Sequence, residues 1–196
     1  LKNQNRYSWT VRRSNSGKCI EVITQSFKAD VVPAVQVSRE ITEDPIVIYS
    51  FSNAMEKVNC PRLHIQNGRN KHERTDKNYK PVVRMFKSWS ANHFGSSDIV
   101  SSYQIESLVH KTPDQKFIND HVDSFILVGD YVVNLLAAGI PVESVCGTEY
   151  ITSNWERENI RQFQATLANS LAHVASAYRA ASAQEALNHW NRTFNI

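Results

Sequence analysis

The sequence contains 196 residues with a formal net charge of +3, and 41% of its residues are hydrophobic and 21% charged. This composition is typical of a globular protein, and so small a charge does not indicate nucleic-acid binding unless basic residues cluster locally. No apolar run approaches the roughly 20 residues that a membrane-spanning helix needs, and the N-terminus lacks the pattern of a signal peptide. We therefore expect a cytoplasmic protein with no membrane partner.

The length suits one domain, or part of a larger protein. Because the chain begins at Leu1 instead of Met, we expect it to be a fragment or a processed piece. Its three cysteines, Cys19, Cys60 and Cys146, are odd in number and far apart in sequence. This spacing favours reduced thiols over a disulfide framework or a zinc site.

The N-terminal region has the pattern of short β-strands. From Tyr7 to Val37, runs of apolar and β-branched residues are separated by the turn residues 14–17, which predicts an antiparallel hairpin followed by a third strand. Residues 46–49 predict one more strand. The polar stretch 53–74 contains Pro61 and Gly68, which break regular structure, and predicts an irregular surface loop.

Asp30 places a carboxylate on the apolar run Ala29–Val32. In a mostly buried strand an ionised Asp needs compensation for its lost hydration, and a divalent metal is one solution. The alternative is that Asp30 marks the end of a strand before Pro33, and this stretch alone favours that alternative.

The remainder of the chain has helical periodicity. The apolar spacing predicts helices over about 75–94, 99–111 and 118–138, and Ser-x-x-Glu capping boxes at 153–156 and 182–185 predict two more. The sequence thus predicts an α+β fold, with antiparallel strands in residues 1–60 and a helical domain in residues 61–196.

The first predicted helix carries two stripes. The apolar stripe is expected to face the core: Val82, Phe86, Trp89 and His93. The cationic stripe lies on another face: Lys77, Lys80, Arg84 and Lys87. A charged stripe is usually a solvated surface, but Lys and Arg also bind phosphate through charge-assisted hydrogen bonds, and the pattern alone does not decide between the two.

Other sites have little support in the sequence. The seven histidines are scattered, and we find no H-E-x-x-H motif, no zinc spacing, no G-x-S-x-G elbow and no phosphate-binding loop. Tyr103, in the second predicted helix, is either a core aromatic or a ring that stacks on a planar ligand, and a lone tyrosine favours the core.

Four stretches taken in order resemble one family. They are Asp30–Ala34, Asn78–Trp89, Ser101–Glu106 and Ala186–Phe194. Together they are similar to the second half of a DNA polymerase beta superfamily nucleotidyltransferase, most closely the cGAS/DncV-like (CD-NTase) synthases of cyclic oligonucleotides, which are related to oligoadenylate synthases. The resemblance implies the remaining strands of a nucleotidyltransferase palm, followed by a helical substrate-binding domain of the poly(A) polymerase and oligoadenylate synthase type.

The resemblance also implies roles for individual residues. Asp30 matches the third catalytic carboxylate, which helps to hold Mg²⁺, with Mn²⁺ as an alternative. Lys87 and Ser102 match residues that contact nucleotide phosphates, and Tyr103 matches a tyrosine that stacks on the nucleobase. Two cations share the face of Lys87 and are expected to assist it: Lys80 and Arg84.

By resemblance, we expect an enzyme that joins ATP, GTP or related triphosphates into cyclic or linear second messengers, in antiviral or antiphage signalling. Its expected partners are the nucleotides, the N-terminal half of the same enzyme, and an activating protein or nucleic acid. The family's Gly-Ser element and paired carboxylates are missing here, so the chain alone is expected to be inactive. The alternatives are an inert nucleotide-binding or protein-interaction module, and a relative acting on RNA 3′ ends or a small-molecule acceptor.

Overall fold

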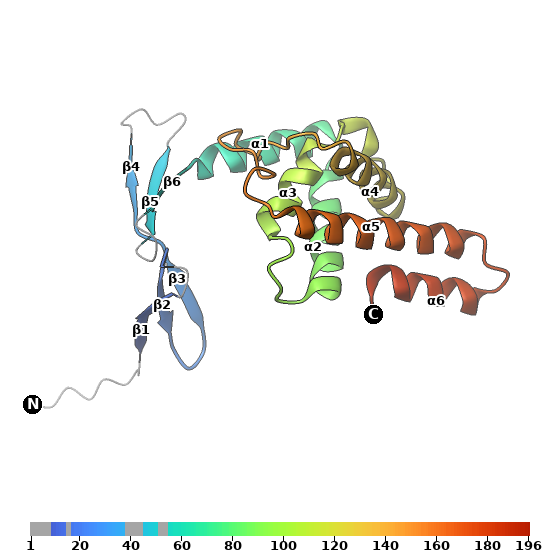
Figure 1. The fold of residues 1–196 in the computed structure, drawn as a ribbon, viewed down its shortest axis with the longest axis horizontal. Helices are drawn as coiled ribbons and strands as arrows, with labels where there is room; N and C mark the ends of the chain where they lie inside the picture. Colours follow the sequence, from blue (N-terminus) through green and yellow to red (C-terminus); the bar gives the residue numbers. More distant parts are fainter. Residues whose placement is uncertain (1–8, 15–16, 38–44, 51–54) are drawn as a thin grey trace, which may run out of the picture. The chain divides into compact units, whose positions relative to one another are not determined.

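The computed structural model describes residues 9–14, 17–37, 45–50 and 55–196 of the chain. These residues form two compact units, divided between Leu63 and His64. The first unit carries the strands and the second is built from helices (Figure 1). The predicted α+β class is therefore confirmed.

The first unit contains two antiparallel sheets of three strands each. One sheet has the order β1-β2-β3, formed by Thr10–Arg13, Ile20–Ile23 and Lys28–Val31. The other has the order β4-β5-β6, formed by Ala34–Gln36, Ile46–Ser50 and Met55–Asn59. The predicted hairpin with a third strand and the predicted strand at 46–49 are both confirmed.

The first sheet exposes apolar side chains. Val11 on β1 is 63% exposed and Val31 on β3 is 51% exposed. Asp30 is the penultimate residue of β3, as the strand-end alternative predicts, and three of the four residues of β3 are exposed, Asp30 among them. A sheet normally buries at least one face, so apolar side chains this exposed are unusual for a sheet, as far as its described residues show.

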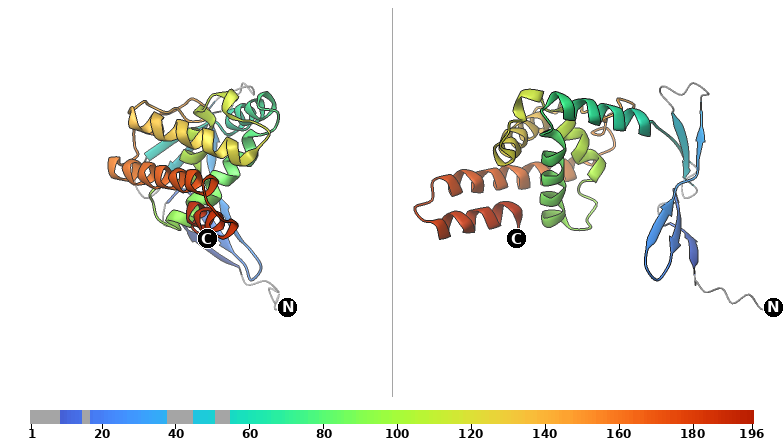
Figure 2. Two further views of the ribbon diagram at one scale, coloured as in Figure 1. Left: turned by 90° about the vertical axis from the view of Figure 1, so that its right-hand side faces the viewer. Right: turned by 180° about the vertical axis from the view of Figure 1, so that it is seen from behind.

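The second unit contains most of α1 and five further α-helices. The helices are α1 Pro61–Arg74, α2 Tyr79–Phe94, α3 Ser102–Lys111, α4 His121–Ala137, α5 Arg157–Tyr178 and α6 Ala183–Phe194, with a short 3₁₀ helix at Asp114–Lys116. Helices α5 and α6 lie side by side (Figures 1 and 2). None of the described helices combines the length and apolar character that crossing a membrane would require.

The core of the second unit is aromatic and lies where α2, α4 and α5 meet. Trp89 of α2 is completely buried; its ring contacts Phe163 of α5, and its indole N–H donates to Ser170 Oγ at 3.0 Å. The ring of Phe86 packs against Phe125 of α4, with 4.4 Å between centroids. The predicted inward face of the first helix is thus confirmed, and it holds the three helices together.

The prediction of an irregular loop at 53–74 is wrong for its described residues, which form β6 and α1. Pro61 is the first residue of α1. At this position the backbone N–H that proline lacks would have no partner inside the helix, and the fixed φ of proline favours helix. Gly68 lies inside α1, and a Cβ atom at Gly68 would lie 4.0 Å from the ring of Tyr79.

Helix α2 begins later than predicted. Asp76 and Lys77 adopt left-handed backbone angles, with φ of 47° and 66°, in the turn between α1 and α2. Lys77 therefore lies outside the helix that carries Lys80, Arg84 and Lys87. The predicted stripe of four cations contains three helical members in the structure.

The two predicted capping boxes have different outcomes. Ser182 caps α6 by accepting from the Glu185 N–H at 3.2 Å, as predicted. The box at 153–156 is wrong, because α5 begins at Arg157 and its N-cap, Glu156, makes no side-chain cap. The buried Trp155, whose indole N–H donates to the Ile99 carbonyl at 2.7 Å, holds this segment outside the helix.

Candidate functional site

Three helices of the second unit enclose a cleft of about 380 Å³. Helices α1, α2 and α3 line it. Its lining includes four cationic side chains, Arg69, Lys80, Arg84 and Lys87, and one carboxylate, Glu106. The three helical cations of the predicted stripe thus lie around one cleft, and Arg69 joins them from the segment that we predicted as a loop.

Lys87 is held by Glu106. The Lys87 ammonium donates to Glu106 Oε2 at 2.7 Å, and His64 Nε2 lies 3.3 Å from Glu106 Oε1. The hydrogen bond from His64, followed by that from Lys87, lowers the pKa of Glu106 to about 2 against the effect of its burial. The same contact raises the pKa of His64. Glu106 is therefore an anion at neutral pH that partly neutralises the cations of the cleft.

Tyr103 does not line this cleft but contacts His64, which does. Its ring stacks on that of His64, with 5.7 Å between centroids and 22° between planes, and its hydroxyl lies 3.8 Å from Cys146 Sγ. The ring is half-buried and packs partly against the core. The structure therefore shows the core packing that a lone tyrosine favours, and Tyr103 reaches the cleft only through its contact with His64, which lines it.

Ser102 is exposed as the first residue of α3 and is not among the residues that line the cleft. Its neighbour Ser101 forms the N-cap, accepting from the Gln104 N–H at 3.2 Å. Lys80 is half-buried and Arg84 is exposed at the cleft.

Tyr79 is a residue of the cleft that our sequence reasoning missed. It is 1% exposed, and its hydroxyl has no hydrogen-bond partner among the residues that the structure describes. A buried hydroxyl without a partner costs about 1–3 kcal/mol, so a ligand that supplied an acceptor here would recover that energy. Tyr79 precedes Val82 by three residues, so extending the apolar stripe by one turn would have identified it.

Asp30 lies in the first unit, on β3. In the sheet register it is directly opposite Glu21, which accepts from Arg12 Nε at 2.7 Å and from Lys28 Nζ at 2.8 Å. Both Glu21 oxygens are therefore engaged by cations. In the described part of the chain no three His, Cys, Asp or Glu residues are grouped so as to hold a metal ion. Asp30 could contribute one oxygen ligand, but these residues do not form a complete Mg²⁺ site.

Residues 66–174, more than half of the chain, match the model of the cGAS/DncV-like nucleotidyltransferase C-terminal helical domain. The chain belongs to this family. The matched region contains most of the cationic cleft, including Lys80, Arg84 and Lys87.

Curated relatives of this cGAS/DncV-like chain are named as cyclic nucleotide synthases. It is 34% identical over 129 residues to the cyclic UMP-AMP synthase of Rhodothermus marinus, and the aligned region covers 60% of this chain and 44% of that protein. It is 32% identical over 127 residues to the cyclic dipurine nucleotide synthase of Elizabethkingia meningoseptica, covering 59% of this chain and 42% of that protein. The chain thus spans about two fifths of the length of the curated relatives it matches.

Solved structures of the family have the same fold. The Elizabethkingia meningoseptica CdnE cyclic dinucleotide synthase with GTP and Apcpp superposes with a TM-score of 0.66 and 26% identity, over 79% of this chain and 62% of that one. Escherichia coli CdnC with ATP reaches a TM-score of 0.77 over 95% of this chain and 65% of that one, and at 13% identity it supports the fold alone. The predicted family and fold are both confirmed.

Proposed function

We propose that this chain is the C-terminal part of a nucleotidyltransferase that joins nucleoside triphosphates into cyclic or linear oligonucleotides. The observation that carries the proposal is the gathering of Lys80, Arg84 and Lys87 around one cleft, within the segment that matches the family model. The names of the curated relatives support the same reaction class.

The charge of the cleft suits a triphosphate. Four cations and one carboxylate line it. Lys and Arg bind phosphate oxygens by charge-assisted hydrogen bonds, and a partly buried site strengthens these bonds compared with bulk water. We assign Lys87 as the principal phosphate ligand, with Lys80 and Arg84 assisting.

Glu106 competes with phosphate for Lys87. The ammonium has three N–H donors, and one of them donates to Glu106, so a phosphate oxygen can take a free donor or replace this carboxylate as the acceptor. Glu106 would retain its contact with His64, 3.3 Å away, so its charge would remain compensated. The orphaned hydroxyl of Tyr79 offers a further donor to a ligand in the cleft.

The nucleobase is proposed to bind beside Tyr103. Stacking of a base on an aromatic ring contributes about 1–3 kcal/mol in single-stranded nucleic-acid complexes. Because one face of Tyr103 already stacks on His64, we assign base stacking to this pair instead of to Tyr103 alone. Ser102, exposed at the start of α3, is assigned to a phosphate contact outside the cleft.

Catalysis is proposed to require Mg²⁺ or Mn²⁺ and further protein. When bound, the metal would activate the attacking hydroxyl and stabilise the departing pyrophosphate. We propose that Asp30 supplies one carboxylate and that an N-terminal half of the same enzyme supplies the others. The exposed Val11 and Val31 on the first sheet support such a covering segment.

We also assign the product to second-messenger signalling of the antiviral or antiphage kind, with an activating protein or nucleic acid as regulator. This part of the proposal rests on the family to which the chain belongs.

Nucleotide binding is tested on the chain itself. Titration with ATP, GTP and UTP by calorimetry is expected to show binding that Lys87→Gln weakens by about tenfold, the loss of one hydrogen bond to a charged group. Lys77→Gln is the matched control, because Lys77 belongs to the predicted stripe but lies outside α2 and does not line the cleft. Equal losses in the two variants would contradict the assignment of the cleft.

Catalysis is tested on the protein expressed with its upstream coding sequence. Labelled triphosphates and Mg²⁺ should yield an oligonucleotide and pyrophosphate, and Asp30→Asn should abolish both while leaving nucleotide binding by the cleft unchanged. Binding without any product under all activating conditions would favour an inert nucleotide-binding module. Growth of an added RNA at its 3′ end would favour a relative with another acceptor.

A further inference from the structure

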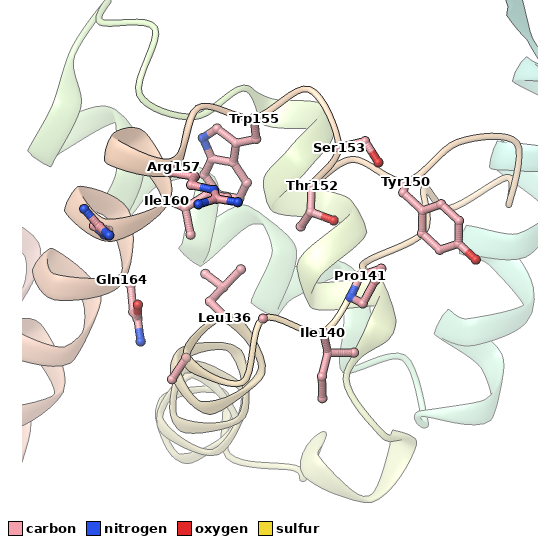
Figure 3. Close-up of a pocket in the computed structure, with 13 residues that line it drawn as sticks. Leu136, Ile140, Pro141, Tyr150, Thr152, Ser153, Trp155, Arg157, Ile160 and Gln164 are labelled. Atoms are coloured by element: carbon pink, nitrogen blue, oxygen red, sulfur yellow. The ribbon is translucent and has the colours of Figure 1, made fainter.

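A second cleft, of about 860 Å³, lies at the end of α4 and the start of α5 (Figure 3). Its lining comes from the last turn of α4, from the segment after α4 and from the first two turns of α5. No lining residue is shared with the cationic cleft of α1, α2 and α3. The two clefts are therefore separate sites of the helical unit, and the proposed function makes no use of this one.

One part of the cleft is apolar. Figure 3 shows Leu136 between Ile160 and Trp155 on one side and Ile140 and Pro141 on the other. The ring of Trp155 is fixed in place, because its N–H donates to the Ile99 carbonyl at 2.7 Å. Ile140 is 46% exposed although it lines a concave surface. Such a surface gains free energy when an apolar ring or chain displaces water from it.

The charge of the cleft has one sign. Arg157 and Arg161, four residues apart on α5, line it, and none of the 13 lining residues is acidic. Arg157 has no hydrogen-bond or ion-pair partner in the portion of the chain that is described. Arg161 lies 3.7 Å from the exposed Glu158, its one ion pair among the described residues. Both guanidinium groups are therefore available to a carboxylate or phosphate, which they recognise by paired hydrogen bonds.

We propose that this cleft binds a small amphipathic anion, an apolar ring or chain that carries a carboxylate or a phosphate. The apolar body lies against Leu136, Ile140 and Trp155, and the anionic group is held by Arg157 and Arg161. The volume of about 860 Å³ falls in the range of small-molecule pockets, which favours a small molecule over a protein partner. Gln164, whose amide donates to the Val133 carbonyl at 3.2 Å, borders the cleft without contributing charge.

The test uses matched probes and calorimetry. Naphthalene-2-carboxylate and 2-naphthyl phosphate are the anionic probes, and 2-naphthalenemethanol is the neutral probe of similar size. Both anions, or one of them, should bind the wild-type chain more tightly than the alcohol does, and the stronger of the two identifies the anionic group. Arg157→Gln should weaken the anions by about tenfold and leave the alcohol unchanged, as expected for one lost charged hydrogen bond. Arg179→Gln removes an exposed charge at the end of α5 and should change the affinity for neither the anions nor the alcohol.

A variant that fills the cleft tests whether the probes bind there, independently of charge. Ala137 lines the cleft, and its exposed neighbour Ala138 does not. Ala137→Trp should abolish binding of all three probes, whereas Ala138→Trp should retain it, with both variants folded as judged by their melting temperatures. The proposal is overturned if the alcohol binds as tightly as the anions, if Arg157→Gln and Arg179→Gln act alike, or if Ala137→Trp still binds. Binding to phosphatidylglycerol vesicles without binding of the soluble probes would also overturn it, because the anion would then belong to a membrane surface.

Discussion

The ammonium of Lys87 lies 2.7 Å from the carboxylate of Glu106, although the two residues belong to different helices and are 19 positions apart in sequence. The proposed phosphate ligand is thus held by a carboxylate of the same cleft before any nucleotide binds. Glu106 therefore both orders the cleft and neutralises part of its charge.

Glu106→Gln is expected to increase nucleotide affinity. A neutral amide competes less strongly than a carboxylate for the Lys87 ammonium, so the triphosphate should bind about three- to tenfold more tightly, corresponding to roughly 1 kcal/mol for a partly exposed pair. Calorimetric titration with ATP measures the change. Glu73→Gln, at an exposed position on α1, is the control for net charge. A decrease in affinity would mean that Glu106 chiefly positions Lys87.

The contact between His64 and Glu106 predicts a pH dependence. Because the folded state raises the pKa of His64, the stability from this contact is complete below the ordinary value of 6.5 and is lost as the pH rises through the raised pKa. NMR titration of the His64 ring should show this raised pKa in the wild type and a return toward 6.5 in Glu106→Gln. An unchanged His64 pKa in the variant would show that another group raises it.

Glu106 predicts how the stability of the protein changes at low pH. Its pKa is lowered from 4.5 to about 2, so its contribution to stability is present above pH 4.5 and is lost as the pH falls toward 2. Urea unfolding at a series of pH values should show wild type more stable than Glu106→Gln at neutral pH. This difference in the free energy of unfolding should shrink as the pH falls from 4.5 to about 2. A constant difference would exclude ionisation of Glu106 as its cause.

Tyr79→Phe is expected to affect stability and binding in opposite directions. Removing a buried hydroxyl that has no partner should leave the free energy of unfolding unchanged or raise it by about 1 kcal/mol. Nucleotide affinity should fall several-fold, because the ligand loses a donor in the cleft. Chemical denaturation and calorimetry measure the two effects separately, and a variant that is less stable yet binds normally would remove Tyr79 from the site.

A buried lysine ties α1 to the end of α3. Lys71 is 3% exposed and donates to the Thr112 carbonyl and to Asp114 Oδ1, each at 2.7 Å. Lys71→Met should cost about 1–3 kcal/mol, because the buried carbonyl loses its donor. Asp114→Asn should cost more, about 3–5 kcal/mol, because the ammonium remains buried without its counterion. Urea unfolding measures both, and the opposite order would contradict this account.

Local patterns in the sequence predicted much of the fold. The hairpin with its third strand, the inward face of Val82, Phe86 and Trp89, and the Ser182 cap all follow from short-range periodicity and capping chemistry. The loop predicted at 53–74 was wrong for residues 61–74, because a polar helix that starts with proline lacks the apolar stripe on which such predictions rely.

The site could be predicted only in part. Spacing along one helix places Lys80, Arg84 and Lys87 on one face, because helical periodicity depends on sequence distance alone. It does not identify Arg69, which comes from the segment predicted as a loop, nor the unpartnered hydroxyl of Tyr79. Both belong to the cleft only because α1 packs against α2 and α3.

The sequence by itself determined the α+β class, the family and a cationic helix face. Only the tertiary structure decided that Glu106 pairs with Lys87, that His64 stacks on Tyr103, and that a separate cleft lined by two arginines lies between α4 and α5. The physical reason is that contacts between helices depend on how whole side-chain surfaces pack. That packing depends on the complete core and cannot be predicted from the residue pattern along any one helix.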